Sequence, residues 1–306
     1  MFGDTIKHFI SILLLLTSTF SAMASIHSTE RQTYHLLFLG NSFTFMPDKS
    51  NTHPVTPLLV KKLLESKGFS VEIDWVTAGG HTLQNHYDEG IFEKHLNDHE
   101  NGYYDYVFIQ PYSIEALELP SCFITTQGPG VKGKEGHDGP EGREMFLKYG
   151  KILVDLVHAH GSKPIVIQPW IYQQGHAWFN EKFVCHDFPD THEAWYGNST
   201  DYEALLDQGY IDLRKEARVE LLKVGLFWKY MRDNPSDTLP MSLMYQEDHY
   251  HPTELGALLT AYLEVQRITH LPADQFPFLP DGMDPKQANY LAKVAMRYFT
   301  TTALAQ

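Results

Sequence analysis

Cysteine is scarce in this sequence, which has only Cys122 and Cys185 among its 306 residues. Two cysteines are too few for a zinc-ribbon site, and the C-x-x-C motif is absent. The chain can therefore form at most one internal disulfide, and a cysteine-bound zinc ribbon is excluded.

Positive charge and long apolar runs are also lacking. Lysine and arginine number 24 against 38 aspartates and glutamates, so the formal net charge is −14. This balance argues against nucleic acid and anionic membrane surfaces as partners. The apolar run at residues 10–16 is too short to span a bilayer, so we expect no stable membrane insertion.

The N-terminal segment has the pattern of a secretory signal peptide. Lys7 precedes the apolar run, and Ala22-Met23-Ala24 forms an A-x-A cleavage pattern after it. We therefore expect residues 1–24 to be a signal peptide and residues 25–306 to form a single domain, secreted or periplasmic.

Strand-like and helix-like segments alternate along the rest of the chain, which predicts an α/β fold: a parallel sheet of about five strands with helices on both faces. The expected strands are 34–40, 69–80, 104–113, 163–172 and 223–228, and the expected helices are 54–68, 82–98, 141–161, 201–222, 253–269 and 284–299. Ligands of such sheets bind at the carboxyl ends of the strands. The residues expected at those ends are Ser42, Gly79, Gly80, Gln110 and Trp170.

Ser42 follows the first expected strand in the stretch LLFLGNSFTF. Taken alone, Gly-Asn-Ser is typical of a turn. A serine hydroxyl becomes a nucleophile only when a base removes its proton and a third group orients that base. His251 is the candidate base, with Asp248 three residues earlier in EDHYHPTELG. An ordinary helix-entry turn is the alternative interpretation of this pair, and His249 is a rival base.

Four blocks in this order, GNSFT, Gly79-Gly80, VFIQPYS and DHYHPTELG, resemble those of the SGNH (GDSL-like) hydrolases. The resemblance extends from Tyr34 to about Thr269 and favours an exported GNSFT branch similar to sialate O-acetylesterase-like carbohydrate esterases. It implies a three-layer αβα fold with a flavodoxin-like sheet, and it implies neither cofactor nor metal.

The resemblance also implies residue roles. Ser42 would be the nucleophile, His251 the general base and Asp248 its orienting partner. The N–H groups of Ser42 and of Gly79 or Gly80 would form the oxyanion hole, joined by the side-chain amide of Gln110.

Two positions depart from the family pattern. Asn41 stands where many members carry Asp, and Ile109-Gln110-Pro111 replaces the usual Gly-x-Asn-Asp run. The Gln110 amide can donate a hydrogen bond as an Asn amide does. The alternative is that Gln110 is a buried amide that ties the strand to its loop.

Two irregular inserts follow the third and fourth expected strands, at residues 121–142 and about 173–200. The first is rich in Gly and Pro, which predicts a solvated loop or a lid over the site. The flavodoxin-like order places these strands side by side, so we expect the inserts to be neighbours and Cys122 and Cys185 to form a disulfide.

Aromatic residues gather in and before the second insert. Trp170, Trp178 and Trp195 are candidates for stacking on the apolar face of a sugar, with a small satellite core as the alternative. A zinc site that combines Asp248, His249 and His251 with histidines 176, 186 and 192 is a further hypothesis. The sequence lacks H-E-x-x-H or a similar spacing, so we predict no metal.

These patterns together predict a secreted serine esterase that removes a short acyl group from a carbohydrate through a Ser-His-Asp triad and a covalent acyl-enzyme. A lipase or thioesterase would use the same triad. A non-catalytic carbohydrate-binding protein on the same scaffold is the alternative from a different class. The sequence does not define the oligomeric state.

Overall fold

The computed structural model describes residues 33–45, 55–117, 141–173, 176, 183–185, 188–192 and 199–302. The described residues form one compact unit. The expected signal peptide, Cys122, Trp178 and Trp195 lie outside them, so the predictions that depend on those residues remain predictions.

Five parallel strands form the central sheet in the order β2-β1-β3-β4-β7, so the predicted flavodoxin-like α/β fold is confirmed. The strands are β1 (Thr33–Gly40), β2 (Ser70–Thr77), β3 (Tyr106–Ile109), β4 (Lys163–Gln168) and β7 (Glu220–Lys223). The central strands β1, β3 and β4 carry continuous runs of buried, mostly apolar residues because both faces of the sheet are covered. Two further strands, β5 (Phe183–Cys185) and β6 (Phe188–His192), form a separate antiparallel pair.

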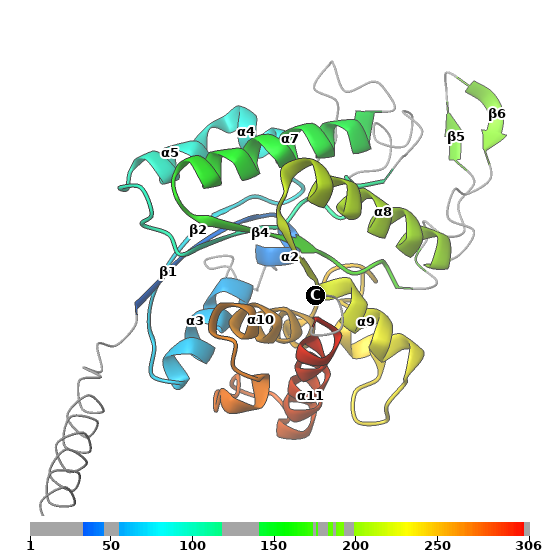
Figure 1. Ribbon diagram of the computed structural model, residues 1–306. Coiled ribbons are helices and arrows are strands. Elements are labelled where there is room, and N and C mark those ends of the chain that lie inside the picture. Colours follow the sequence, from blue (N-terminus) through cyan, green and yellow to red (C-terminus); the bar gives the residue numbers. More distant parts are fainter. Residues whose placement is uncertain are drawn as a thin grey trace, which may run out of the picture. The chain divides into compact units, whose positions relative to one another are not determined.

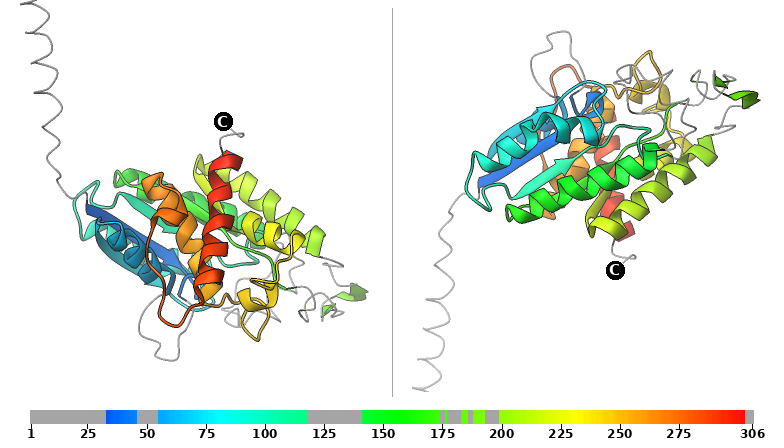
Figure 2. Two further views of the ribbon diagram at one scale, coloured as in Figure 1. Left: turned by 90° about the horizontal axis from the view of Figure 1, so that it is seen from below. Right: turned by 90° about the horizontal axis from the view of Figure 1, so that it is seen from above.

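Helices cover both faces of the sheet (Figures 1 and 2). One face carries α4 (Leu83–Glu89), α5 (Ile91–Asn97), α7 (Glu141–Ala159) and α8 (Ser199–Ala217). The other carries α3 (Val55–Ser66), α9 (Val224–Asp233), α10 (Glu254–Thr269) and α11 (Pro285–Thr302). Short helical turns complete the described chain: α2 (Ser42–Phe45), η2 (Met241–Met244) and η3 (Ala273–Gln275). No helix in the described part of the chain is long and apolar enough to cross a membrane.

The strand predicted at residues 223–228 is wrong. The fifth strand is the shorter β7, and α9 begins directly after it at Val224. The buried residues of α9 are Val224, Phe227, Trp228 and Met231, which recur at the spacing of one helix face. A short apolar run therefore belonged to a buried helix rather than to a strand. The helix expected at 201–222 ends earlier, at Ala217, because Arg218 adopts a left-handed conformation with φ of 52° and the chain then enters β7.

The helix predicted at residues 82–98 is interrupted. Gly90 adopts a left-handed conformation with φ of 66° and donates its N–H to the carbonyl of Tyr87, which ends α4. The chain then starts α5 at Ile91. Glycine adopts this conformation without the steric cost of a side chain, so it separates the two helices.

The strand order determines where a site can form. β1 pairs with β2 on one side and with β3 on the other, so the chain crosses over β1 between these two strands. This crossover is the switch point at which ligands of doubly wound sheets bind, beside the carboxyl ends of the strands. Ser42 lies there, directly after β1.

Candidate active site

Ser42 lies in a sharp strand-to-helix turn. β1 ends at Gly40, and the short helix α2 begins at Ser42 itself. Asn41 caps this helix: its side-chain oxygen accepts the N–H of Phe43 at 3.2 Å, and its carbonyl accepts the N–H groups of Thr44 at 3.0 Å and Phe45 at 2.9 Å. The turn thus holds a half-buried hydroxyl at the edge of the sheet.

Gly40 is required for this turn because the backbone there is crowded. A Cβ at Gly40 would lie 2.5 Å from Thr44 Oγ1 and 3.1 Å from Gln110 Oε1. The Gly40 carbonyl accepts a hydrogen bond from His86 Nε2 at 3.0 Å. Burial, reinforced by the nearby His81, lowers the pKa of His86 to about 4, so this imidazole is neutral at neutral pH.

A continuous chain of hydrogen bonds joins Ser42 to the C-terminal segment. His251 Nε2 lies 2.8 Å from Ser42 Oγ, and His251 Nδ1 lies 2.6 Å from Asp248 Oδ2. In the neutral imidazole, Nδ1–H donates to Asp248, which leaves Nε2 to accept the hydroxyl proton of Ser42. The structure therefore brings together the three residues predicted as a catalytic triad.

Asp248 is itself held in place. Its Oδ1 accepts the backbone N–H groups of Tyr250 at 3.1 Å and His251 at 3.0 Å. Partial burial alone would raise the pKa of Asp248, but the hydrogen bonds from the His251 ring and from these two N–H groups outweigh it, and the pKa is lowered. The carboxylate is thus charged at neutral pH and orients the imidazole. It loses this role as the pH falls through its lowered pKa.

His249, the rival base, faces elsewhere. Its Nδ1 lies 2.9 Å from Gln173 Oε1, and its carbonyl accepts the N–H of Gln173 at 2.8 Å. It adopts a left-handed conformation with φ of 66°, which reverses the chain between Asp248 and His251. The residue is therefore part of the loop that presents His251 and not a partner of Ser42.

Gly79 and Gly80 form a turn beside the nucleophile. His81 donates its N–H to the carbonyl of Ala78 at 3.3 Å, and Gly80 has a φ of 72°. Two hydrogen bonds attach this turn to the end of β1: the Ala78 N–H to the Gly40 carbonyl at 3.1 Å, and Asn41 Nδ2 to the His81 carbonyl at 3.2 Å.

The backbone N–H groups needed for an oxyanion hole remain available near Ser42. Within the described part of the chain, the N–H groups of Ser42, Gly79 and Gly80 donate no hydrogen bond. Backbone donors of this kind stabilise the negative oxygen of a tetrahedral intermediate.

The Gln110 side chain has a structural role, and its donation to the oxyanion remains a prediction. The Gln110 side chain is buried, and its oxygen accepts the Asn41 N–H at 3.2 Å and the Thr44 hydroxyl at 3.1 Å. Its amide nitrogen donates to the carbonyl of Pro111. Gln110 therefore ties the end of β3 to the nucleophile turn, as in the alternative interpretation, while one N–H of its amide has no described partner.

The prediction that Trp170 binds substrate is wrong. Trp170 is only 2% exposed, and its ring is stacked between Phe43, at a centroid distance of 4.8 Å, and Trp228, at 4.2 Å. Its indole N–H donates to the carbonyl of Tyr250 at 3.1 Å. Trp170 therefore supports the Ser42 turn and the His251 loop from inside the core.

Sequence reasoning missed Tyr250, whose ring lies beside the base. The centroids of the Tyr250 and His251 rings are 4.1 Å apart, and the half-buried ring of His176 lies 5.7 Å from Tyr250. The aromatic residue between Asp248 and His251 was the available signal. These half-buried rings lie next to the triad, as does the buried ring of Phe43, whose centroid is 5.7 Å from that of His251.

The zinc hypothesis gains no support from the described residues, among which no three His, Cys, Asp or Glu side chains form a metal-binding group. His176 is described and contacts Tyr250, while His186 lies outside the described residues. The prediction of no metal remains a prediction.

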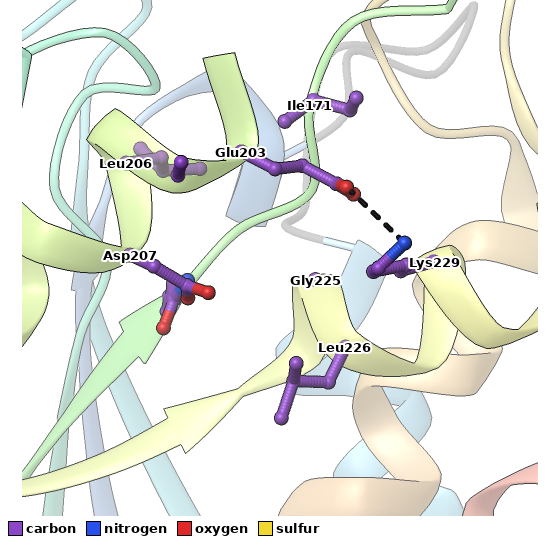
Figure 3. A pocket seen from close by; sticks show the side chains of 9 residues that line it. Ile171, Glu203, Leu206, Asp207, Gly225, Leu226 and Lys229 are labelled. Atoms are coloured by element: carbon purple, nitrogen blue, oxygen red, sulfur yellow. Dashed lines mark hydrogen bonds and ion pairs between the residues drawn. The ribbon is translucent and has the colours of Figure 1, made fainter. Parts of the chain in front are cut away.

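A separate pocket opens between α8 and α9, at the carboxyl ends of β4 and β7 (Figure 3). Its volume is about 220 Å³, and none of the triad residues lines it. Glu203 and Lys229 face each other across it at 3.6 Å, with Leu206 and Leu226 among its apolar walls (Figure 3). The pocket is therefore distinct from the Ser42 site.

Comparison with known proteins identifies the fold. The chain matches no protein-family model and no curated protein sequence. Among solved structures, it is similar to a DUF4886 family protein from Bacteroides uniformis, with 15% identity and a TM-score of 0.58 over 88% of this chain and 95% of that one. It is also similar to a putative SGNH hydrolase from Slackia heliotrinireducens, with 16% identity and a TM-score of 0.50 over 78% of this chain and 100% of that one. The chain has the SGNH hydrolase fold, as the sequence resemblance predicted.

Proposed function

We propose that the chain is a serine esterase that hydrolyses carboxylic esters through a covalent acyl-enzyme. The observation that carries the proposal is the continuous hydrogen-bonded chain from Asp248 through His251 to Ser42, with distances of 2.6 and 2.8 Å. These three hydrogen-bonded residues lie at the switch point of the sheet, next to backbone N–H groups that have no described partner. Serine nucleophiles in proteins are activated by this arrangement of carboxylate, imidazole and hydroxyl.

The geometry supports a two-step reaction. Ser42 Oγ attacks the ester carbonyl carbon while His251 Nε2 takes the hydroxyl proton, and the carbonyl oxygen becomes an oxyanion that accepts backbone N–H groups. The intermediate collapses, the alcohol leaves with the proton from His251, and the acyl group stays on Ser42. Water then attacks the acyl-enzyme, His251 again moves the proton, and the acid leaves with Ser42 restored.

The proposed substrate is a carbohydrate that carries a short acyl ester, and the enzyme is proposed to act on it after export. The rings of Phe43, Trp170 and Trp228 are stacked directly behind the Ser42 turn, so that side of the site is filled and favours a small acyl group. The half-buried rings of Tyr250 and His176 beside the base favour a sugar ring as the alcohol part. The predicted signal peptide supports export.

A serine-directed fluorophosphonate tests the esterase proposal. We expect one adduct per native chain, located on the peptide that contains Ser42, because only a hydroxyl paired with a base reacts at a useful rate. Intact-mass measurement and peptide mapping check this result, with heat-denatured protein as the control. An unlabelled native chain would instead favour the non-catalytic carbohydrate-binding alternative.

The acyl preference is tested with p-nitrophenyl esters of increasing chain length. We expect kcat/KM to be largest for the acetate and to fall by at least about tenfold at the octanoate, because the stacked rings leave little room behind Ser42. Initial rates across the series check this expectation. A maximum at the octanoate would assign the same triad to a lipase or thioesterase.

A further inference from the structure

Glu115 is a buried carboxyl group that the reaction described above does not use. It lies after β3 in a tight segment, where its N–H donates to the Tyr112 carbonyl at 3.0 Å and the Leu117 N–H donates to the Ile114 carbonyl at 3.1 Å. Glu115 is 7% exposed. Burying a carboxyl group is costly unless hydrogen bonds satisfy it, so its partners indicate what it does.

The two carboxyl oxygens bind two different loops of the site. Oε1 accepts the backbone N–H of Leu83 at 2.9 Å, and Oε2 accepts the backbone N–H of Tyr112 at 3.0 Å. Leu83 is the first residue of α4, and Tyr112 is the second residue after Gln110. One side chain therefore joins the loop after β2 to the loop after β3.

The loop after β2 contains the Gly79–Gly80 turn. Its first end is attached to β1 through the hydrogen bond from Ala78 to Gly40. Its other end continues through Thr82, which caps α4, into Leu83, which Glu115 holds. The bond between Leu83 and Glu115 therefore adds to the bond from Asn41 Nδ2 to the His81 carbonyl in setting the position of the glycine N–H groups relative to Ser42.

The segment that carries Glu115 is itself firmly anchored. A Cβ on Gly209 of α8 would lie only 2.3 Å from the carbonyl oxygen of Ala116, so the helix backbone packs directly on this segment. The Ser113 hydroxyl lies 2.9 Å from the hydroxyl of Tyr172. Glu115 thus belongs to a firmly packed segment, as a residue must if it is to position another loop.

We propose that Glu115 is a positioning residue of the proposed esterase, whose carboxyl group holds the Gly79–Gly80 turn and the loop after β3 beside Ser42. The proposal rests on the esterase function and adds a residue that acts through the oxyanion donors without touching the substrate. Displacing such a donor weakens stabilisation of the transition state more than binding of the ground state, so it lowers kcat rather than raising KM.

Glutamine is the informative replacement. Burial raises the pKa of Glu115 to about 8, although the N–H groups of Leu83 and Tyr112 oppose the shift, so the carboxyl group is mostly protonated at pH 7. The titratable groups that face it are Tyr112 and Tyr210, both of which have raised pKa values through burial. Glu115→Gln therefore keeps size and charge at pH 7, but places an NH2 group against one of the two N–H donors.

The test compares Glu115→Gln with Glu264→Gln. Glu264, in α10, is a second buried carboxyl group, but neither of its oxygens has a hydrogen-bond partner among the described residues. With p-nitrophenyl acetate at pH 7, we expect Glu115→Gln to lower kcat by at least about tenfold with KM within about twofold of wild type. Glu264→Gln is expected to leave both within about twofold. Thermal unfolding verifies that each variant is folded.

Hydrogen exchange gives a reading that does not depend on activity. We expect the amides of residues 79–83 to exchange faster in Glu115→Gln than in Glu264→Gln, because one of the bonds that hold the loop is weakened. An unchanged kcat together with unchanged exchange overturns the proposal. If wild type hydrolyses no ester, the esterase function fails, while the exchange difference still decides whether Glu115 holds the loop. If Glu115→Gln does not fold, Glu115→Asp, whose shorter side chain cannot reach both N–H groups, carries the same expectations.

Discussion

Replacement of Ser42 by alanine is expected to lower the rate of ester hydrolysis by about ten-thousandfold or more, and to abolish labelling by a fluorophosphonate. The proposed reaction has no other group that can carry the acyl chain. The substitution removes one hydroxyl whose hydrogen-bond partner is His251 Nε2, at 2.8 Å. The Asn41 cap of α2 uses backbone groups and the Asn41 side chain, so the turn should survive. Initial rates and intact-mass measurement check the result.

A matched serine controls for effects on folding. Ser66 lies at the end of α3, where its hydroxyl donates to the carbonyl of Leu63 at 2.6 Å. Ser66→Ala should keep hydrolysis within about twofold of wild type, as expected for surface substitutions away from a site. If Ser42→Ala were as active as Ser66→Ala, the proposed nucleophile would be wrong.

Replacement of His251 by alanine is the second large effect, and we again expect a loss of about ten-thousandfold in kcat/KM. Without the imidazole, no described group accepts a hydrogen bond from the Ser42 hydroxyl, and Asp248 has no ring to orient. Members of a triad act as a unit, so the double variant Ser42→Ala/His251→Ala should be no slower than either single variant. Steady-state kinetics of the three variants check this.

His249 offers the control two residues away. Its ring contacts Gln173 and not Ser42, and its backbone has a φ of 66°. Asparagine tolerates this left-handed conformation better than alanine, so His249→Asn is the appropriate variant. We expect it to retain at least about a third of the wild-type rate. A greater loss in His249→Asn than in His251→Ala would reverse the assignment of the base.

Much of the fold could be predicted from the sequence because its central strands are buried on both faces. The continuous apolar run of β1 and the alternation of strands with helices led to a parallel sheet of about five strands. The error at residues 223–228 arose where periodicity is ambiguous, since a run of six residues fits a strand as well as the first turns of a buried helix. The break at Gly90 depended on one backbone conformation.

The candidate site could be predicted where its residues follow strand ends in the order typical of the family. Ser42, Asp248 and His251 meet as expected. Gln110 and Trp170 show the limit of this reasoning, because the sequence does not reveal the partners that occupy a buried amide or a buried ring. Glu115 was missed because its role depends on a contact with Leu83, which is distant in the sequence, and no sequence motif indicates that contact.

The nucleophile and its base are 209 residues apart along the chain. The serine follows the first strand of the sheet, and the imidazole belongs to the loop that precedes α10. Pairings between such distant segments require a large loop to close and are slow to form. Ester hydrolysis would therefore return last during refolding, after the helical signal, and would report that the carboxyl-terminal third of the polypeptide has docked.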